Sequence, residues 1–507
     1  MMNNNYAIID IGSNTMRLVI YKQGVSGRLH EVQNVKSIAR LRNNLNEDYV
    51  LTEEGIAKLI STLRSFQKVV DTYTIHHLSC IATATIRQAT NQHELVELVK
   101  QEVGWDMRIL SEEEEAFYGY LSVVNSTSIE EGITIDIGGG STEITYFEGR
   151  ILKYSHSFPF GALTLKSLTS DYSSKEASLE GIRVFIQSQL QTLPWLINKR
   201  VPVIGIGGSA RNMAQIDQNK KAYPLAGLHQ YEMSSEDVTG IITELASLDH
   251  ERLEKVEGLS KDRADTIVPA MCVFEQLMKE VDTKCFILSR KGLRDGVFYE
   301  LLSRKSNHNL YPNVLEDSLV ELMHEYNLSA PHINHRRLLS KKLIEEVAKY
   351  GIDLLAEKDM RLLEQACIVY NLGKYIDAES SSQHSFYLLA NRTIDGLSHK
   401  ERLTLALAAS YKNKTIFKQF YKPYKNWFTK QEKKAIVLIG SLVKFVYSLD
   451  ATGRQIVEDV KLEFLEDRVQ LMIYCNEDPS LEQYQAEKQK KHIEKALHRN
   501  IELQFIS

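Results

Sequence analysis

Residues Ile133-Thr134-Ile135-Asp136-Ile137-Gly138-Gly139-Gly140-Ser141-Thr142 form an apolar run that leads directly into a glycine turn. The turn is followed by Glu143-Ile144-Thr145-Tyr146-Phe147, whose β-branched and aromatic residues predict a second strand. The segment is therefore expected to be a β-hairpin whose loop consists of small residues. Asp136 lies at the end of the first strand, immediately before that loop.

The same pattern occurs near the N-terminus, where Ala7-Ile8-Ile9-Asp10-Ile11-Gly12-Ser13-Asn14-Thr15 precedes the run Arg17-Leu18-Val19-Ile20-Tyr21. A third apolar strand, from Val203 to Ile206, enters the turn Gly207-Gly208-Ser209 and then a predicted helix start. Asp-Ile-Gly recurs at Asp10 and Asp136 in the same hairpin context, which indicates an internal duplication. We therefore expect two related α/β domains that face each other across a cleft.

Helical patterns lie between these strands and dominate towards the C-terminus. Apolar spacing and capping residues predict helices over 52–70, 111–124 and 261–281. Glycine becomes rare after residue 315, and residues 460–475 alternate like two strands. The predicted fold class is α/β, with domain I over 1–126, domain II over 127–305 and a mainly α-helical domain over 313–507 that carries a small β element and a subdivision near residue 445.

Length and composition exclude several classes of protein. A chain of 507 residues is too long for one hydrophobic core, and 43% hydrophobic with 25% charged residues is typical of globular proteins. The five cysteines are scattered, which suits a reducing compartment. No signal peptide and no membrane-spanning apolar run is visible, so we expect a cytoplasmic protein without a membrane partner. A net charge of -5 argues against duplex nucleic acid as the main partner.

The glycine turns predict an anion site, because backbone N–H groups that no side chain covers can converge on one phosphate. A carboxylate at the end of a buried strand is costly unless it is compensated. Asp10, Asp136 and Glu143 are therefore predicted to bind Mg²⁺, with hydrogen bonding of the aspartates to their own turns as the alternative. Phosphate-binding roles are expected for the residues of the three turns: Gly12, Ser13, Asn14, Gly138, Gly139, Gly140, Ser141, Gly207, Gly208 and Ser209.

These residues resemble the exopolyphosphatase / guanosine pentaphosphate phosphohydrolase family, within the superfamily of actin, sugar kinases and heat-shock chaperone ATPases. The resemblance implies two ribonuclease H-like (actin-like ATPase) domains that flank a cleft, followed by a mainly helical, HD-like domain. The matching motifs follow the family's order over the first 300 residues: Asp10 to Thr15, Ala82 to Arg87, Ser111 to Ala116, Asp136 to Glu143, Gly205 to Ser209, Gly258 to Asp265 and Gly292 to Gly296.

The resemblance also implies catalytic roles. In the family, a glutamate on the helix before the second glycine loop positions and activates water, and the Glu-Glu-Ala motif assigns this role to Glu115. The register stays open among the four glutamates Glu112 to Glu115. Arg87 is expected to hold a phosphate oxygen, and Asp136 and Glu143 complete the predicted catalytic set. Two further arginines, Arg17 and Arg263, are weaker candidates, and Arg263 has Asp265 as an alternative partner.

The C-terminal region resembles HD-type metal phosphohydrolases more loosely. Tyr370-Asn371 stands where a metal-binding His-Asp pair would be, so we expect this domain to lack catalysis and His384 to be a core residue. Residues 412–434 carry eight lysines interleaved with aromatic residues. Single-stranded nucleic acid, or a solvated face over core residues, would explain this pattern, but we expect a track for a long polyanion that includes Lys418, Lys422 and Lys425. The basic helix predicted over 488–499 is interpreted as plain surface.

The predicted function is that of a Mg²⁺-dependent exopolyphosphatase that releases orthophosphate from inorganic polyphosphate. The same residues would serve a phosphohydrolase that converts guanosine pentaphosphate to the tetraphosphate, and a non-catalytic sensor of polyphosphate or alarmone is the alternative from another class. The lysine-bearing C-terminal domain favours polyphosphate. A C-terminal domain of this size also makes a homodimer our expectation.

Overall fold

The computed structural model describes residues 5–24, 28–168, 174–306, 310, 312–352, 354–466, 468–497 and 499–507. The chain divides into two units, of which the first comprises 1–223 with 228–314 and the second comprises 224–227 with 315–507. This division lies close to the predicted start of the C-terminal domain. The boundary predicted between residues 126 and 127 and the subdivision near 445 stay predictions.

The first unit contains a five-stranded sheet in the order β3-β2-β1-β4-β5. Strands β1 and β2 pair antiparallel, whereas β4 runs parallel to β1. Apolar residues of helices α1 (Glu53–Val70) and α3 (Gln92–Val103) cover one face of this sheet, and Thr52 caps α1 as its sequence predicts. The strands are β1 (Asn5–Ile11), β2 (Thr15–Gln23), β3 (Leu29–Ile38), β4 (Ile75–Ala82) and β5 (Met107–Ile109).

A second, six-stranded sheet of the same unit has the order β10-β11-β9-β6-β7-β8. One face packs in a single hydrophobic cluster against five helices: α5 (Ala162–Leu168), α6 (Lys175–Leu190), α7 (Gly207–Lys220), α8 (Ser235–Ser247) and α10 (Ile267–Val281). The strands are β6 (Glu131–Ile137), β7 (Thr142–Glu148), β8 (Ile151–Phe158), β9 (Val203–Ile206), β10 (Tyr231–Ser234) and β11 (Cys285–Leu288).

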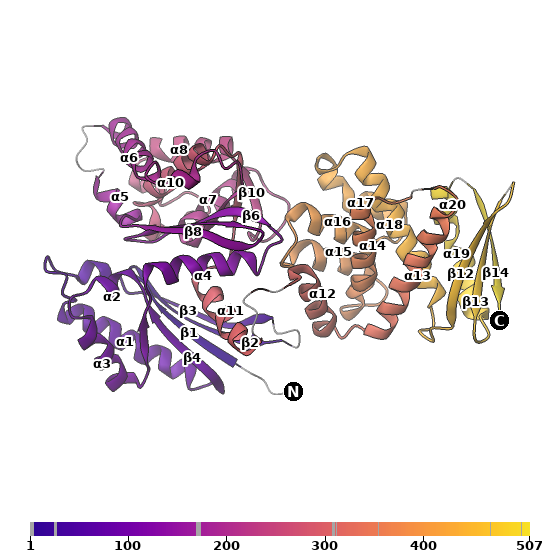
Figure 1. The fold of residues 1–507 in the computed structure, drawn as a ribbon, viewed down its shortest axis with the longest axis horizontal. Helices are drawn as coiled ribbons and strands as arrows, with labels where there is room; N and C mark the ends of the chain where they lie inside the picture. Colours follow the sequence, from indigo (N-terminus) through magenta and orange to yellow (C-terminus); the bar gives the residue numbers. More distant parts are fainter. Residues whose placement is uncertain are drawn as a thin grey trace. The chain divides into compact units, whose positions relative to one another are not determined.

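Helices α4 (Glu112–Val124) and α11 (Leu293–Ser306) pack on each other between the two sheets (Figure 1). Tyr118 and Phe298 belong to a cluster with Tyr6 of the first sheet. Val124 and Tyr299 belong to another cluster, which includes Phe147, Ile204 and Ile206 of the second sheet. Because both helices are apolar on two sides, they join the sheets into one unit. They also place Glu115, in the first turn of α4, close enough to Asp10 and Asp136 for their charges to interact.

The secondary structure confirms most of the predicted elements of the first unit. β1–β2 and β6–β7 are the two expected hairpins, and β9 runs into helix α7 at the third glycine turn. The helix predicted over 261–281 begins later, at Ile267, after a single 3-10 turn over Lys261–Arg263. The α/β fold class is therefore confirmed.

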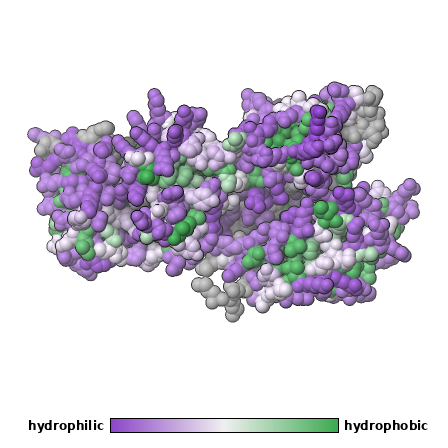
Figure 2. All heavy atoms as spheres, turned by 180° about the vertical axis from the view of Figure 1, so that it is seen from behind, coloured by the Kyte–Doolittle hydropathy of each residue, from purple (hydrophilic) through white to green (hydrophobic). Residues whose placement is uncertain are grey.

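The second unit is mainly helical. Its small sheet contains the predicted hairpin of β12 (Val457–Phe464) and β13 (Arg468–Cys475), and a third strand, β14 (Asn500–Ile506), pairs parallel to β13. Its surface is mostly hydrophilic on the face drawn in Figure 2. The helices are α12 (Val314–Glu325), α13 (Ala330–Ala348), α14 (Glu357–Val369), α15 (Ser381–Asn391), α16 (His399–Ala409), α17 (Lys414–Tyr421), α18 (Lys430–Leu449), α19 (Ser480–Gln489) and α20 (Lys491–Leu497).

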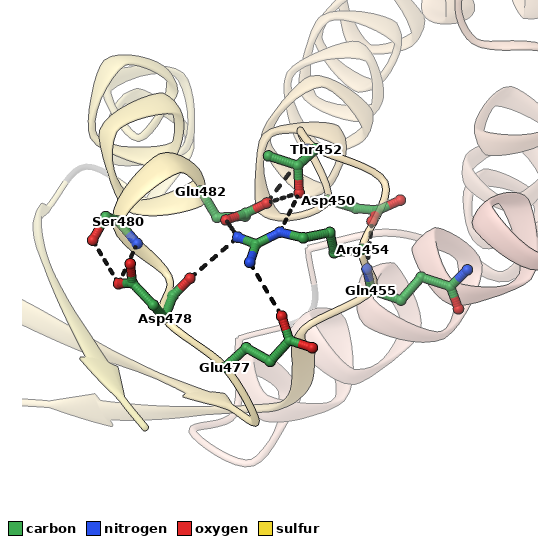
Figure 3. Close-up of polar contacts among 8 residues, drawn as sticks. All are labelled: Asp450, Thr452, Arg454, Gln455, Glu477, Asp478, Ser480 and Glu482. Atoms are coloured by element: carbon green, nitrogen blue, oxygen red, sulfur yellow. Dashed lines mark hydrogen bonds and ion pairs between the residues drawn. The ribbon is translucent and has the colours of Figure 1, made fainter.

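The connection from α18 to β12 is held by Arg454 (Figure 3). Its guanidinium donates to Glu477 Oε2 at 3.2 Å, to the Asp478 carbonyl oxygen at 3.1 Å and to Glu482 Oε2 at 2.9 Å. Glu482 is almost fully buried, so this arginine compensates its charge. The acidic residues at this end of the small sheet therefore have a structural role. In the part of the chain that the structure describes, no helix is long and apolar enough to cross a membrane.

Candidate active site

The two hairpin loops lie against each other in the first unit. A Cβ atom at Gly139 would lie 3.2 Å from Ser13 Cβ, so the second loop approaches the first at the position of a glycine. Each loop is closed by one hydrogen bond, from Gly12 N to the Thr15 carbonyl oxygen at 3.1 Å and from Gly138 N to the Ser141 carbonyl oxygen at 2.9 Å. The duplication seen in the sequence thus produces two facing loops of the same construction.

The carbonyl groups of the second loop bind neighbouring backbone. Ala162 N and Leu163 N, at the start of α5, donate to the carbonyl oxygens of Gly138 and Gly139 at 2.9 and 3.0 Å. This approach requires a glycine at 161, because a Cβ atom there would lie 2.6 Å from the Gly138 carbonyl oxygen. The start of α5 therefore holds the second loop in place through the carbonyl groups of that loop.

The carbonyl groups of the first loop are bound in the same way. Arg40 N and Arg42 N donate to the carbonyl oxygens of Asn14 and Ser13 at 2.9 and 3.1 Å. Among the residues that the structure describes, the backbone N–H groups at 13, 14, 139 and 140 donate to no protein acceptor. Loops whose carbonyl groups are bound while their N–H groups remain available suit an anion such as phosphate.

The third glycine turn makes room for two charged side chains. Gly207 has a φ of +81°, and a Cβ atom there would lie 2.3 Å from Asp136 Oδ1. A Cβ atom at Gly208 would lie 2.2 Å from Arg263 Nη2, and Arg263 Nη1 donates to Ser209 Oγ at 3.3 Å. These three residues, predicted to bind phosphate, contact Asp136 and Arg263 in the structure. Asp265, the alternative partner considered for Arg263, pairs with Lys166 instead.

The carboxylates predicted to bind metal lie near the loops. Asp10, at the end of β1, accepts a hydrogen bond from Arg294 Nη1 at 2.9 Å. Asp136 occupies the equivalent place on β6, and its burial raises its pKa to about 6. Glu143 is buried on β7 and accepts from Ser157 Oγ at 3.2 Å. Burial, followed by the charge of Glu115, raises the pKa of Glu143 to about 8.

The glutamates at the N-terminus of α4 make different contacts. Ser111 Oγ accepts from Glu114 N at 3.2 Å, and the Glu114 carboxylate accepts from Ser111 N at 2.8 Å, which forms a capping box. Glu114 also pairs with Arg108. Glu113 is exposed, whereas Glu115 contacts Arg87 and is 13% exposed. Glu114 serves the cap, whereas two other glutamates of this run face Arg87: Glu115 pairs with Nη1, and Glu112 Oε1 lies 3.6 Å from Nη2. Glu115 is the more buried of the two.

Arg87 and Glu115 form a pair that the sequence did not predict. Arg87, from the short helix α2 (Ala84–Gln88), donates through Nη1 to the Leu110 carbonyl oxygen at 2.7 Å and to Glu115. Burial raises the pKa of Glu115 to about 7, while the positive charge of Arg87 acts in the opposite direction. The Nη2 atom of Arg87 is buried and makes no hydrogen bond to a described residue, although it lies 3.6 Å from Glu112 Oε1 in an ion pair. This donor could bind a substrate oxygen.

Further arginines surround the carboxylates. Burial and the charges of Arg17, Arg290, Arg294 and Arg263 lower the pKa of Arg211 to about 10. The Nε atom of Arg211 is buried and has no hydrogen-bond partner among the described residues. Of this group, only Arg17 and Arg263 were candidates from the sequence, although Arg211 lies two residues after the third glycine turn and Arg294 lies in the Gly292–Gly296 motif. Cations that repel one another in a partly buried site suit a polyanionic ligand.

The carboxylates of the same site carry negative charge, which would attract a divalent cation. Within the described residues, no group of three or more His, Cys, Asp or Glu side chains is arranged as a complete metal site. Mg²⁺ commonly uses only one or two carboxylates and completes its shell with waters and substrate phosphates. Asp136 and Glu143 fit this pattern. Burial and neighbouring carboxylates raise the pKa of both groups, so a bound cation would offset negative charge that the site now leaves uncompensated. Asp10, in contrast, already binds Arg294.

The remaining predicted residues lie in the second unit. Lys418, on α17, and Lys422 and Lys425, in the following 3-10 turn, are exposed. Tyr370 ends α14, and burial raises its pKa. His384 is half-buried on α15 and packs beside Gly373, where a Cβ atom would lie 2.8 Å from His384 Cβ.

Two family models match the chain, one over most of the first unit and one over most of the second. Residues 19–305 match the model of the Ppx/GppA phosphatase family, and residues 314–489 match the model of Ppx/GppA phosphatase, domain III. The chain is similar to the crystal structure of an Aquifex aeolicus member of the Ppx/GppA protein family, with 27% identity over 61% of this chain and 100% of that chain and a TM-score of 0.54. An exopolyphosphatase from Cytophaga hutchinsonii has the same fold, with 24% identity over 59% of this chain and 98% of that chain and a TM-score of 0.53.

The matched ranges include Arg87, Glu115 and the second and third glycine turns, and the helical second unit corresponds to a domain of the same family. The family predicted from the motifs is thereby confirmed, while the likeness of the second unit to HD domains stays a prediction. The chain belongs to the Ppx/GppA phosphatase family and is a hydrolase of that family.

Proposed function

We propose that this hydrolase is an exopolyphosphatase, which removes terminal phosphates from inorganic polyphosphate. The observation that carries the proposal is the surplus of cationic and N–H donors beside one glutamate with a pKa near neutrality. Polyphosphate has a negative charge on every phosphoryl group, so a chain end would meet donors from both loops and from the arginines. This ligand would also offset the mutual repulsion of Arg211 and its neighbours.

The proposed reaction is an in-line attack of water on the terminal phosphorus. Glu115 orients the water and accepts its proton, a task for which a pKa of about 7 is suited. The bond from the terminal phosphorus to the bridging oxygen breaks, and that oxygen leaves with the shortened chain. Arg87 lies beside Glu115, and its Nη2, which makes no hydrogen bond to a described residue, can bind an oxygen of the transferred group.

The loops hold the phosphates that do not react. Their available N–H groups bind phosphoryl oxygens, and the fixed backbone of the α5 start prevents the second loop from relaxing away. Mg²⁺, held by Asp136 and Glu143, would offset negative charge on the phosphoryl oxygens when bound. Asp10, the third carboxylate that the sequence predicts to bind Mg²⁺, positions Arg294. A cytoplasmic location and a homodimeric state belong to this proposal.

The first test compares two substrates with the purified full-length protein in the presence of Mg²⁺. We expect orthophosphate release from long-chain polyphosphate to be at least about tenfold more efficient, by kcat/KM, than release from guanosine pentaphosphate. EDTA should abolish both activities, and Mg²⁺ should restore them. The reverse preference would make the chain an alarmone phosphohydrolase with the same chemistry. Binding of polyphosphate without any release would instead support the sensor function.

The second unit has a basic surface that suits a long chain. Lys418, Lys422 and Lys425 are exposed, and none of them pairs with a described acid. Nearby, Lys444 Nζ donates to the Lys412 carbonyl oxygen at 2.6 Å, and burial together with Lys491 and Lys412 lowers the pKa of Lys444. The basic helix interpreted as plain surface therefore contributes to a shared positive field. Such a field attracts polyanions and releases their counterions.

Replacement of Lys418, Lys422 and Lys425 by glutamine is expected to raise the KM for long-chain polyphosphate about tenfold, because exposed ion contacts contribute about 0.2–1 kcal/mol each. Tripolyphosphate, which has few phosphates beyond those at its reacting end, should keep its KM. A matched triple variant at Lys341, Lys342 and Lys349, which pair with acidic residues of the same unit, should leave both values unchanged. Equal increases of KM for both substrates would contradict the track.

A further inference from the structure

The second unit contains a cluster of basic residues where the connection from α16 to α17 meets α18 and α20. Lys444, on α18, donates through Nζ to the Lys412 carbonyl oxygen at 2.6 Å. The ring of His492, at the start of α20, packs edge-on against Tyr411 with 5.7 Å between the ring centroids. The cluster consists of His492 and five lysines: Lys412, Lys414, Lys444, Lys491 and Lys495.

Acidic side chains do not compensate this cluster. Helices α18 and α20 contain one acidic residue each, and α17 contains none. Glu432 of α18 pairs with Lys400, and Glu494 of α20 accepts a hydrogen bond from Ile501 N at 3.0 Å. Within the part of the chain that the structure describes, none of the five lysines forms an ion pair with an acid. Their positive charges therefore repel one another.

Lys444 differs from the other four lysines because it is partly buried, whereas they are exposed. Burial, followed by the charges of Lys491 and Lys412, lowers the pKa of Lys444. Burial, followed by the charges of Lys444 and other lysines, lowers the pKa of His492 to about 4, so this ring is neutral at pH 7. A neutral lysine amine can still donate one N–H to the Lys412 carbonyl oxygen, and it retains a lone pair that can attack an electrophile.

The exposed lysines suit an electrophile that also carries a phosphate group. Lysine binds phosphate as a point charge, and several exposed lysines attract a doubly negative group more strongly than one does. In an acyl phosphate, one oxygen joins the phosphate to an electrophilic carbonyl carbon. The lysines that attract this phosphate would also stabilise it as the leaving group. The cluster therefore combines a nucleophile with a site for the leaving group.

We propose that Lys444 is a modification site that takes the acyl group of an acyl phosphate, whose phosphate the surrounding lysines hold. The neutral amine attacks the carbonyl carbon and forms a C–N bond, and the bond from that carbon to the bridging oxygen breaks. The proton of the amine passes to the departing phosphate, so the products are an amide and hydrogen phosphate. The amide is uncharged, so the modification removes one cation from the cluster. The inference does not depend on the reaction proposed at the glycine loops.

The test measures acetylation of the full-length protein by acetyl phosphate, with quantitative mass spectrometry of the lysine-containing peptides. EDTA is present so that hydrolysis does not consume the donor. Lys342 is the matched reference, because its Nζ also donates to a backbone carbonyl oxygen, that of Glu458, at 2.9 Å, but pairs with Asp459 at 2.8 Å. We expect the initial rate at Lys444 to exceed that at Lys342 at least about tenfold, since lowering a pKa by one raises the neutral fraction of an amine about tenfold.

A double variant tests whether the surrounding lysines hold the phosphate. Lys491→Gln combined with Lys495→Gln retains Lys444 and should slow its acetylation by acetyl phosphate at least about threefold, because exposed ion contacts are individually weak. The N-hydroxysuccinimide ester of acetic acid carries no phosphate, so its reaction with Lys444 should slow less. Lys490→Gln is the control, since Lys490 pairs with Glu487, and should leave both rates unchanged. Equal acetylation of Lys444 and Lys342 would overturn the inference, as would equal slowing of both donors or no slowing in the double variant.

Discussion

Replacement of Glu115 by glutamine is expected to lower orthophosphate release from polyphosphate about a thousandfold, within the range that a positioned general base contributes. Glutamine has the shape of glutamate but cannot accept the proton of the attacking water. The loss should appear in kcat, because Glu115 acts on water rather than on the phosphate chain. Circular dichroism and the affinity for polyphosphate are expected to remain close to those of the wild type, which would separate the chemical step from folding and binding.

The neighbouring glutamate provides the control for this prediction. Glutamine at 114 still suits the third position of a capping box, so Glu114→Gln should retain both the start of α4 and the activity. Glu114→Ala loses the bond to Ser111 N and the pair with Arg108, and is expected to lower the free energy of unfolding by about 1 kcal/mol. If Glu114→Gln lost activity while Glu115→Gln stayed active, the catalytic glutamate would be Glu114 and not Glu115.

Local patterns in the sequence predicted those elements whose cause is local. The hairpins at Asp10 and Asp136 follow from apolar strands interrupted by small residues, and Ser111 marks the start of α4 because its hydroxyl can cap the helix. The strand β14 was missed. It pairs with β13 across two intervening helices, and such long-range pairing leaves little trace in the strand itself.

The candidate site was predictable only in part, for the same reason. Motifs indicated Arg87 and Glu115 separately, but their contact depends on how α2 packs beside the N-terminus of α4. Gly161 had no recognisable signal, since its requirement arises from the carbonyl group of Gly138, which is distant along the chain. The sequence left the register of the glutamate run open, and only the three-dimensional contacts show that Glu114 serves the cap while Glu112 and Glu115 face Arg87.

The arginine cluster was the largest omission, and it allows a second strong prediction. Arg211→Gln is expected to lower kcat/KM for polyphosphate about a hundredfold, since a charge-assisted hydrogen bond to a ligand contributes about 1.5–3 kcal/mol. The melting temperature of the ligand-free protein should rise, not fall. The pKa of Arg211 is lowered to about 10, so the group is still charged at pH 7–9, and its charge there opposes folding. Phosphate release and a thermal melt measure the two effects.

Removal of a cation that serves a ligand lowers activity and raises stability. Removal of a structural cation lowers stability instead. Adding tripolyphosphate should raise the melting temperature of the wild type more than that of Arg211→Gln, because the ligand offsets a repulsion that the variant lacks. Arg200→Gln is the control: Arg200 is exposed and pairs with Asp282, so its removal should change neither quantity appreciably. A lower melting temperature for Arg211→Gln without ligand would mean that Arg211 stabilises the fold through contacts of its own, and the cluster would then not be a site prepared for an anion.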